Sequence, residues 1–317
     1  VSLGLESWSM ANVVVIGGGL TGLAAAWELE RQRIPYTLIE VKNRFGGSII
    51  TERRAGFTLD GSAFLLEKYG DWDFLPELGL EEALMSYGRY RDGELVYFRD
   101  GTQTLIDALA RRITAPVLRR MAVSSIGQLD AEHFGICLEN GVMLDARAVI
   151  VTAPARFTEH MLYSLDPEIA LALLDYRYDP VVRVALGYRQ VDLPPLPPLD
   201  ECKFVETFTL PERVPVDHVL IRAGVRLSAT IKTPAEALER VKVAINASPV
   251  VEWAAYWPES DPLTRYLPEH SAVMQLIEER LPAGVALVGS DYRAHRLDQQ
   301  VTDGQAAARQ IAAYLRR

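Results

Sequence analysis

The sequence has few of the residues that mark several protein classes. Its two cysteines, Cys137 and Cys202, lie far apart and outside any CxxC motif. We therefore expect two inert thiols in a reducing compartment, and neither a disulfide framework nor a cysteine metal site. The five histidines show no metal-ligand spacing, and no GxSxG motif is present. The sequence thus gives no support to a metalloenzyme or a serine hydrolase.

Positive charge and long apolar runs are also scarce. The chain has 33 basic and 42 acidic residues, a formal net charge of −9, and its basic residues occur as scattered pairs. Nucleic acid is therefore not an expected partner. No run approaches the roughly 18 apolar residues of a spanning helix, and no secretory signal pattern is visible. We expect a soluble, cytoplasmic protein without a transmembrane segment. Residues 1–9, before Met10, carry no clear pattern and are left out of the fold prediction.

A glycine-rich turn is the strongest positive signal in the sequence. The apolar run Val13–Ile16 leads into Gly17-Gly18-Gly19-Leu20-Thr21-Gly22, and a helix-forming segment follows. In a dinucleotide site, Gly17 would make the tight turn, Gly19 would let a pyrophosphate approach the backbone, and Gly22 would let helix and strand pack closely. The helix would direct its free N–H groups and the positive end of its dipole at the phosphates.

Glu40 completes this dinucleotide pattern. It ends a second apolar strand, Tyr36–Ile39, about 20 residues after the glycines, where a carboxylate can accept hydrogen bonds from a ribose diol. Because an acid here disfavours a phosphorylated ribose, we expect the adenosine half of FAD or NAD rather than NADP. A turn that needs glycine only for packing is the alternative interpretation. The order of strand, glycines, helix, strand and acid favours binding.

Periodicity and turn residues predict the remaining elements. Asn140-Gly141 is the strongest hairpin signal, and Gly46-Gly47 indicates either a second close approach to a ligand or an ordinary hairpin turn. The predicted helices are Thr102–Ile113, Pro234–Ile245, Ser271–Leu281 and about Thr302–Leu315, with Asp303 near the start of the last. The predicted strands include Pro116–Val123, His133–Glu139, Val142–Leu144, Ala148–Val151, Val181–Tyr188, Phe204–Thr209, Val219–Ala223, Ser228–Ile231 and Val285–Gly289.

Three separated segments together resemble one family. They are the pattern ending at Glu40, the segment Arg44-Phe45-Gly46-Gly47, and the C-terminal stretches Val288–Tyr292 and Gln300–Ala307. The sequence resembles the flavin amine oxidase superfamily, and within it the protoporphyrinogen oxidases. The stretches Phe98–Leu105, Val149–Pro154 and Trp257–His270 are similar to further family segments.

The resemblance implies a fold and a cofactor. The expected fold is α/β: a Rossmann-like (GR2-type) FAD-binding domain with a second, reduced mixed-sheet α+β substrate domain. The FAD-binding domain would comprise residues 10–64, 100–154 and 281–317, and the substrate domain residues 65–99 and 155–280. The expected cofactor is FAD.

The resemblance also implies which residues bind FAD. They are Gly17, Gly19, Leu20, Thr21, Gly22, Glu40, Val41, Arg44, Gly46, Gly47, Ser48, Val123, Gly289, Asp291 and Val301. The backbone of Val123 would meet the adenine, and Asp291 would lie near the phosphates and the ribityl chain. Val301 and the helix it opens would face the flavin pyrimidine, where a helix dipole favours the negative charge of reduced flavin.

Three departures from the family pattern concern the surroundings of the flavin and the substrate. Ser48 stands where relatives commonly have a basic residue, and the long helical subdomain that relatives insert before Gly101 is almost absent. None of the five lysines matches the family's lysine near flavin N5. For substrate contact the sequence offers Trp257, Arg265, Tyr266 and His270, because aromatic walls with a cation suit a flat or acidic ligand. The alternative is that these side chains fill the core.

The leading hypothesis is an FAD-dependent oxidoreductase that oxidises a C–N or C–C unit of a small molecule by hydride transfer to flavin. A second hypothesis is a non-catalytic flavin-binding or partner-binding protein. In this second case an exposed flavin would need a cover, which would be a second copy of the chain in a homodimer or another protein. A third is an NAD-dependent dehydrogenase, which explains the segment from Gly17 to Glu40 but leaves the other two family segments unexplained.

Overall fold

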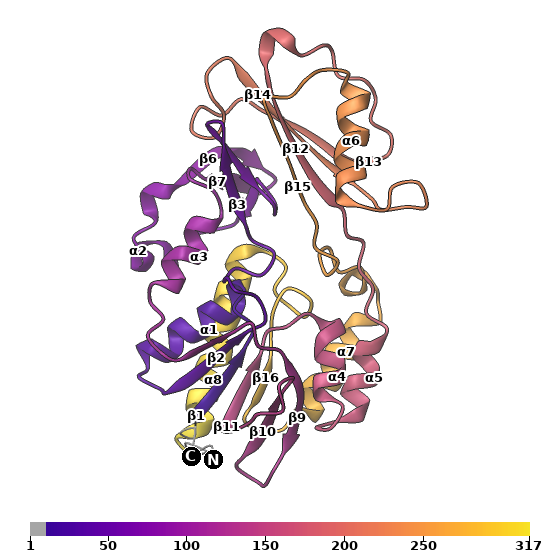
Figure 1. Ribbon diagram of the computed structural model, residues 1–317. Coiled ribbons are helices and arrows are strands. Elements are labelled where there is room, and N and C mark those ends of the chain that lie inside the picture. Colours follow the sequence, from indigo (N-terminus) through magenta and orange to yellow (C-terminus); the bar gives the residue numbers. More distant parts are fainter. Residues whose placement is uncertain (1–10) are drawn as a thin grey trace, which may run out of the picture. The chain divides into compact units, whose positions relative to one another are not determined.

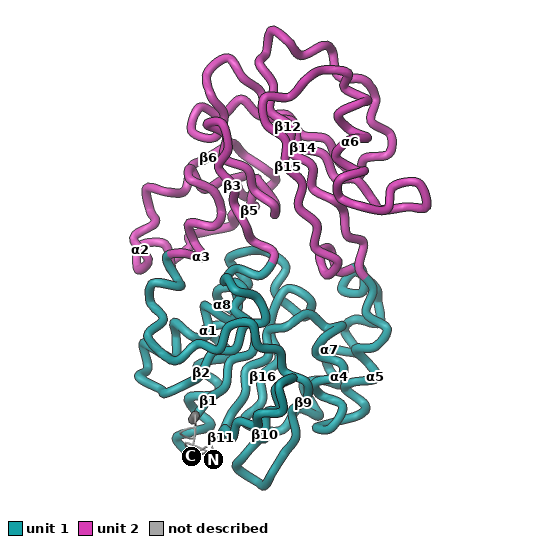
Figure 2. Tube along the Cα trace, viewed as in Figure 1, with its two compact units in different colours: residues 1–47, 108–177, 263–317 teal, residues 48–107, 178–262 magenta. Residues whose placement is uncertain are grey.

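The structure, a computed structural model, describes residues 11–317 and divides into two compact units (Figure 2). Unit 1 contains the chain up to Gly47, Ala108–Arg177 and Leu263–Arg317, and unit 2 contains Ser48–Asp107 and Tyr178–Pro262. Met10, where the FAD-binding domain was predicted to begin, and residues 1–9 lie outside the described residues. None of the described helices is long and apolar enough to cross a membrane.

The units and the predicted domains have different boundaries. Residues 48–64 and 100–107, predicted as part of the FAD-binding domain, pack in unit 2, and residues 155–177 and 263–280 pack in unit 1. The two units group residues that pack together, and this grouping does not test which residues bind a cofactor. The assignment of three segments to FAD binding therefore stays a prediction.

A seven-stranded sheet forms the centre of unit 1. Its order is β8-β2-β1-β11-β10-β9, and β16 also pairs with β11. Strands β2, β8, β11 and β16 make parallel pairs, while β10 is antiparallel to β9 and β11. Its strands are β1 (Ala11–Ile16), β2 (Tyr36–Glu40), β8 (Val117–Arg119), β9 (Val123–Gln128), β10 (Phe134–Leu138), β11 (Met143–Val151) and β16 (Val285–Leu287). Val13, Val14 and Val15 are fully buried, as expected for a parallel strand covered on both faces.

Helices of unit 1 lie in two groups. α1 (Leu20–Arg31) and α8 (Leu297–Leu315) lie side by side (Figure 1). They pack closely because Gly304 has no side chain: a Cβ there would lie 2.3 Å from the carbonyl oxygen of Thr21. The second group contains α4 (Ala155–Leu162), α5 (Pro167–Leu174) and α7 (His270–Arg280), with the 3-10 turn η3 (Thr264–Tyr266) next to α7. The Asp166 carboxylate caps α5 by accepting from the N–H groups of Glu168 and Ile169.

Three smaller sheets form unit 2. The largest is antiparallel, in the order β13-β14-β12-β15, and the others are β3-β4 and β5-β7-β6. The strands are β3 (Thr51–Arg54), β4 (Phe57–Asp60), β5 (Leu66–Lys68), β6 (Leu84–Tyr90), β7 (Gly93–Phe98), β12 (Val182–Arg189), β13 (Cys202–Phe208), β14 (His218–Val225) and β15 (Val251–Ala255). The helices are α2 (Phe74–Leu78), α6 (Pro234–Ile245) and the 3-10 turns η1 (Glu81–Ala83) and η2 (Gln190–Asp192); α3 (Gln103–Ala110) crosses the boundary between units. Ala237, Val241 and Ile245 of α6 bury its apolar face in a core with β12 and β14.

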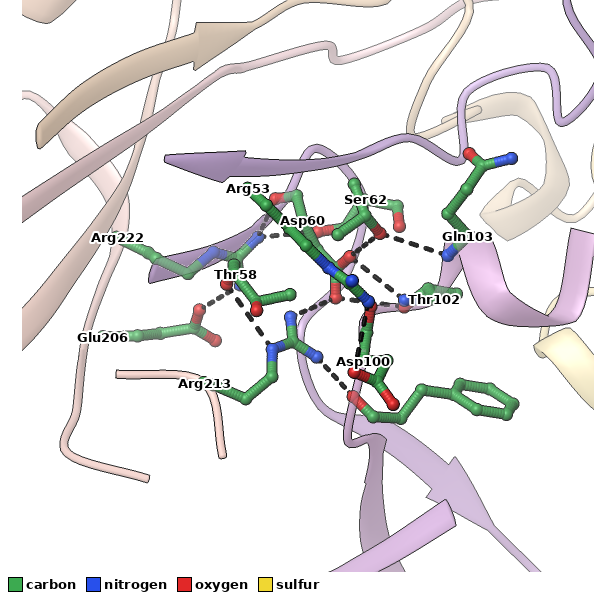
Figure 3. A network of polar contacts seen from close by, with 12 residues as sticks. Arg53, Thr58, Asp60, Ser62, Asp100, Thr102, Gln103, Glu206, Arg213 and Arg222 are labelled. Atoms are coloured by element: carbon green, nitrogen blue, oxygen red, sulfur yellow. Dashed lines mark hydrogen bonds and ion pairs between the residues drawn. The ribbon is translucent and has the colours of Figure 1, made fainter. Parts of the chain in front are cut away.

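A buried ionic network holds unit 2 together (Figure 3). The Asp60 carboxylate, at the end of β4, accepts from Arg213 Nη2 at 2.6 Å and from both the N–H and hydroxyl of Thr102. Arg213 also donates to the Phe98 carbonyl at 2.6 Å, and neither its side chain nor that of Asp60 is exposed. Arg222 donates to Glu206 and to the Ser62 carbonyl, and burial lowers its pKa to about 10.

Most of the predicted elements are present, with three corrections. The predicted strands Val142–Leu144 and Ala148–Val151 are one strand, β11, because no glycine or proline interrupts the chain between them; its first half pairs with β10 and its second with β16. The strand predicted over Pro116–Val123 breaks after Arg119, where Arg120 has a φ of 55°. Ser228–Ile231 is a turn, since the Ser228 hydroxyl accepts from the N–H groups of residues 230 and 231.

Candidate cofactor site

The glycine-rich turn between β1 and α1 contains two glycines that the fold itself requires. Gly17 has a φ of 106°, and a Cβ there would lie 2.5 Å from the Thr152 hydroxyl. A Cβ on Gly22 would lie 1.8 Å from the carbonyl oxygen of Gly17, so helix and strand meet as predicted. Protein packing therefore explains both residues without a ligand.

Gly19 is different, because nothing in the protein requires a glycine there. It is the N-cap of α1 with a φ of −74°, which any residue adopts. The nearest atom to a Cβ built on it is the Cα of Gly47, 4.0 Å away, and Gly47 has a φ of 59°. We call this pair of facing glycines the glycine cradle. It leaves open space in front of the N-terminus of α1, where Leu20, Thr21 and Gly22 have N–H groups without intrahelical acceptors. Those features fit a phosphate group.

The Glu40 carboxylate lies next to this cradle. One carboxylate oxygen accepts from the N–H of Gly18 at 2.7 Å and the other from the N–H of Lys42 at 2.7 Å. These bonds fix a side chain that is only 4% exposed. Each carboxylate oxygen has a second lone pair, so Glu40 can still accept from a ribose hydroxyl. Val41, the next residue, is exposed.

Arg44 shapes the loop that carries Gly46 and Gly47. Its guanidinium donates to the carbonyls of Phe45 at 3.0 Å and Gly47 at 2.8 Å, and the N–H of Gly46 donates to the carbonyl of Gly18 at 2.8 Å. Burial lowers the pKa of Arg44, and the charge of Glu40 opposes that effect. The loop is thus tied to the first glycine turn. Ser48 is exposed and is the first residue of unit 2.

The C-terminal family segment also lies in unit 1 and is firmly held. Asp291 is 2% exposed, and its carboxylate accepts from the N–H of Ala155 at 2.9 Å, at the start of α4. The Tyr176 hydroxyl donates to the Asp291 carbonyl at 2.9 Å. Gly289, with a φ of 136°, donates its N–H to the Asp303 carboxylate at 3.2 Å. Burial raises the pKa of Asp303, and the hydrogen bond from the N–H of Gly289 opposes this effect to a smaller extent.

The start of the last helix differs from the prediction. α8 begins at Leu297, not near Thr302, because the Gln299 side chain accepts from the N–H groups of His295 and Arg296 and ends the preceding loop. Val301 therefore lies inside the helix and is fully buried, and it does not open the helix. Asp303 is not an N-terminal residue either. The free N–H groups of α8 belong to residues 297–299.

Val123 is the first residue of β9 and is 2% exposed. Two residues earlier, the N–H of Met121 donates to the carbonyl of Glu40 at 3.2 Å. The backbone before β9 is therefore hydrogen-bonded to Glu40, the residue predicted to bind the ribose.

The four predicted substrate residues are not in one unit: Trp257 belongs to unit 2, whereas Arg265, Tyr266 and His270 belong to unit 1. Arg265 donates to the Ser290 carbonyl at 3.2 Å and to the Tyr266 hydroxyl at 2.6 Å, and its Nε is buried without a hydrogen-bond partner. Tyr266 is 69% exposed.

His270 is buried, and both its ring nitrogens have partners within unit 1. Nε2 lies 2.7 Å from the carbonyl of Tyr292 and Nδ1 lies 3.0 Å from the Tyr176 hydroxyl. This position favours a role in supporting the Asp291 segment over direct substrate contact. No local pattern in the sequence marks Tyr176, because its partners lie far along the chain.

Two polar side chains near the glycines were also not identified as part of the site. The Thr152 hydroxyl donates to the carbonyl of Ile16 at 2.9 Å, and the Asp303 carboxylate accepts from Gly289. Thr152 lies in the segment Val149–Pro154 that resembles the family, which is a signal that could have found it. Within residues 11–317, no group of three or more histidine, cysteine, aspartate or glutamate residues could hold a metal ion.

Comparison with known proteins identifies relatives over parts of the chain. A coproporphyrinogen III oxidase of Propionibacterium freudenreichii subsp. freudenreichii is 34% identical over 82 residues, which are 25% of this chain and 16% of that protein. A putrescine oxidase of Kocuria rosea is 37% identical over 112 residues, 32% of this chain and 21% of that protein. The matches therefore span about a fifth or less of the length of these curated relatives.

A solved structure supports the fold over nearly the whole chain. A "putative protoporphyrinogen oxidase" from Exiguobacterium sp. 255-15 is similar with a TM-score of 0.76 and 16% identity, covering 99% of this chain and 100% of that chain. At this identity the likeness shows the fold alone, and it confirms the predicted Rossmann-like fold of the flavin amine oxidase type.

Two family descriptions match the sequence. Residues 15–78 match the NAD(P)-binding Rossmann-like domain, and residues 62–223, about half of the chain, match the flavin containing amine oxidoreductases. The glycine cradle, Glu40 and the Arg44 loop supply what the adenosine diphosphate part of a flavin cofactor needs. The chain therefore belongs to the family of flavin-containing amine oxidoreductases, and its cofactor is FAD.

Proposed function

We propose that this protein is an FAD-dependent oxidoreductase that oxidises a C–N or C–C unit of a small molecule. The single observation that carries the proposal is the glycine cradle. Gly19 lacks a side chain although neither its φ of −74° nor any neighbour within 4.0 Å demands it. A ligand that fills this space would give the absence of a side chain at Gly19 a physical reason.

The chain's own residues would bind and orient the cofactor. Gly19 and Gly47 would admit the pyrophosphate against the N-terminus of α1, and Glu40 would accept hydrogen bonds from the adenosine ribose. Arg44 would hold the loop and supply positive charge near the phosphates. Bound FAD would accept the hydride equivalent. The residues that orient the substrate decide which bond is oxidised.

For substrate binding we propose Arg265 and Tyr266 of unit 1, and Trp257 of unit 2 as a separate candidate. The partly exposed guanidinium of Arg265, which lies over the Tyr266 ring, supports its assignment, because a cation beside an aromatic ring suits a flat or acidic ligand. We propose no direct contact for His270. Val123, Gly289 and Asp291 remain proposed contacts of the cofactor.

We further propose that the protein acts in the cytoplasm, does not bind nucleic acid, and forms a homodimer that covers the flavin. The net charge of −9 and the scattered basic pairs support the absence of a nucleic-acid partner. Size-exclusion chromatography with light scattering tests the dimer: a monomer at all protein concentrations would contradict it.

The test of the function has two steps. First, the protein is incubated with excess FAD, unbound cofactor is removed, and the visible spectrum is recorded; a folded sample without flavin bands refutes the proposal. Second, the flavoprotein is mixed anaerobically with porphyrinogens, amines and unsaturated acids. Bleaching of the flavin by one class identifies the substrate class. Retained flavin that no candidate bleaches would favour the non-catalytic alternative.

A further inference from the structure

The start of α8 lies beyond the glycine cradle. α1 and α8 run in the same direction, because Thr21 is next to Gly304 and, further along both helices, Glu28 pairs with Arg309 at 3.7 Å. α8 begins at Leu297, seven positions before Gly304, which corresponds to about 10 Å along a helix. A ligand with its phosphates in the cradle can therefore extend along this distance to the N-terminus of α8.

Three side chains of unit 1 gather next to this helix start. His295 lies two residues before Leu297, and its backbone N–H donates to the Gln299 side chain at 3.0 Å. The His295 ring stacks on that of Tyr266 with centroids 6.4 Å apart, and the Arg265 guanidinium lies 4.8 Å from the centroid of the same tyrosine ring. His295 and Tyr266 are exposed and Arg265 is half-buried, so a ligand can reach this cluster.

Arg265 and Tyr266 together suit an acidic group. Arg265 donates from Nη2 to the Tyr266 hydroxyl at 2.6 Å and from Nη1 to the Ser290 carbonyl at 3.2 Å. Because the Tyr266 oxygen accepts this bond, its own O–H can donate to a ligand, and each Nη of the arginine carries a second N–H. A carboxylate accepts such bonds strongly, since the donor is charged.

His295 has the properties of a proton acceptor at neutral pH. Partial burial, followed by the positive charges of Arg265, His270 and Arg296, lowers its pKa below the usual value of 6.5. These cations belong to η3, α7 and the start of α8, and the acid closest in sequence, Asp298, pairs with Arg296 at 3.0 Å. A neutral imidazole has one ring nitrogen with a lone pair, so it can take up a proton.

We propose that His295 is a catalytic residue, which accepts a proton from a carboxylate-bearing substrate held by Arg265 and Tyr266. The inference rests on the proposed oxidoreductase function. Oxidation of an H–C–X–H unit to C=X, where X is nitrogen or carbon, removes two hydrogens. One leaves carbon with the C–H electron pair, which FAD takes up. The other leaves X as a proton, and the X–H electron pair forms the second bond of C=X. The proton goes to the unprotonated ring nitrogen of His295, which becomes an imidazolium.

Benzoate, a flat carboxylate, tests the location of the pocket without turnover. The FAD-saturated protein is labelled with ¹⁵N-histidine, and the ring resonances of His295 are assigned with His295→Asn. Benzoate is expected to shift these resonances and to leave those of His160, an exposed histidine of α4, unchanged. Arg265→Gln, checked for retained flavin, and replacement of benzoate by uncharged benzyl alcohol should each weaken binding at least about tenfold. Absence of a His295 shift at about 10 mM benzoate overturns the proposal, since a Kd of 1 mM corresponds to only about −4 kcal/mol.

The proton transfer is tested with the compound class that bleaches the flavin. The rate constant of anaerobic flavin reduction is measured from about pH 5 to 9, and it should fall as the pH drops through the pKa of His295, because an imidazolium cannot accept a proton. H295N should react about 10²–10⁴-fold more slowly and lack this acid limb. Imidazole added to the buffer should restore part of the rate, which a merely structural role would not allow.

His160→Asn is the matched control and should keep both the rate and the acid limb. Equal rates and equal pH profiles of H295N and H160N overturn the role of His295 and leave the proposed function intact. A flavin that no compound bleaches contradicts the proposed function itself, and the role of His295 falls with it.

Discussion

Replacing Gly19 with alanine separates cofactor binding from folding. The new methyl group would have no neighbour closer than 4.0 Å, and the φ of −74° suits alanine. Alanine is a weaker N-cap than glycine by up to about 1 kcal/mol, and the reduced freedom of the unfolded chain returns about 0.4–1 kcal/mol. We therefore expect the free energy of unfolding of the FAD-free protein to change by less than about 1 kcal/mol. The variant would fold.

FAD affinity should respond differently. A methyl group in the space that the pyrophosphate requires costs about 1–3 kcal/mol, as overpacking does elsewhere, which corresponds to a Kd raised roughly 5- to 150-fold. The assay is quenching of flavin fluorescence on binding, together with urea unfolding of the FAD-free protein.

Gly22→Ala is the matched control for this prediction. Its Cβ would lie 1.8 Å from the carbonyl oxygen of Gly17, and only movement of the backbone can relieve that clash. This variant should lose at least about 3 kcal/mol of stability without FAD. If G19A binds FAD as tightly as the unmodified protein, or unfolds as readily as G22A, the reasoning about the glycine cradle is refuted.

Three further predictions concern buried or paired carboxylates. Asp60→Asn leaves the fully buried Arg213 without its counter-charge and should cost about 3–5 kcal/mol of unfolding free energy, and a loss below about 1 kcal/mol in urea unfolding would contradict this account of unit 2. The hydrogen bond from Arg226 holds the pKa of Asp179 below its usual range, so the contribution of ionised Asp179 to the stability of the fold is present above about pH 4 and is lost as the pH falls further. In melting curves recorded over a series of pH values, Asp179→Asn should reduce the fall in melting temperature below about pH 4. An unchanged fall would contradict the assignment. In Glu40→Gln, the amide N–H₂ group would face one of the two backbone N–H donors, so one hydrogen bond that holds the side chain is lost. We expect FAD binding to weaken roughly tenfold in the fluorescence assay, whereas the exposed control Glu82→Gln should leave it unchanged.

The local parts of the fold were predictable from the sequence. The strand, glycine turn, helix and acid from Val13 to Glu40 form as expected, since each residue acts within one βαβ unit. The limits of α6 agree with the prediction because Thr233 and Glu236 form a capping box directly before and within the helix. The Asn140-Gly141 hairpin also forms, with a φ of 83° at the glycine.

What the sequence did not reveal depends on partners far along the chain. Asp303 looked like an N-terminal helix residue, but its carboxylate accepts from Gly289 instead. His270 looked like a ligand contact in an aromatic segment, and it is held by Tyr176, 94 positions away. Such pairings follow from tertiary packing, and a local pattern contains no information about them. α5 is a different case, since Asp166 followed by proline is a helix N-terminal signal that the sequence itself contains.

The contact between α1 and α8 has a consequence for how the protein is made. The helix whose N-terminus faces the glycine cradle packs against residue Gly304, near the other end of the described chain, and β16 completes the same sheet. During synthesis, the segments of unit 2 between residues 48 and 262 leave the ribosome before this partner exists. The side of α1 that packs against α8 is therefore exposed until α8 has been synthesised. Nascent chains halted before α8 should be the species that chaperones bind and that FAD does not rescue.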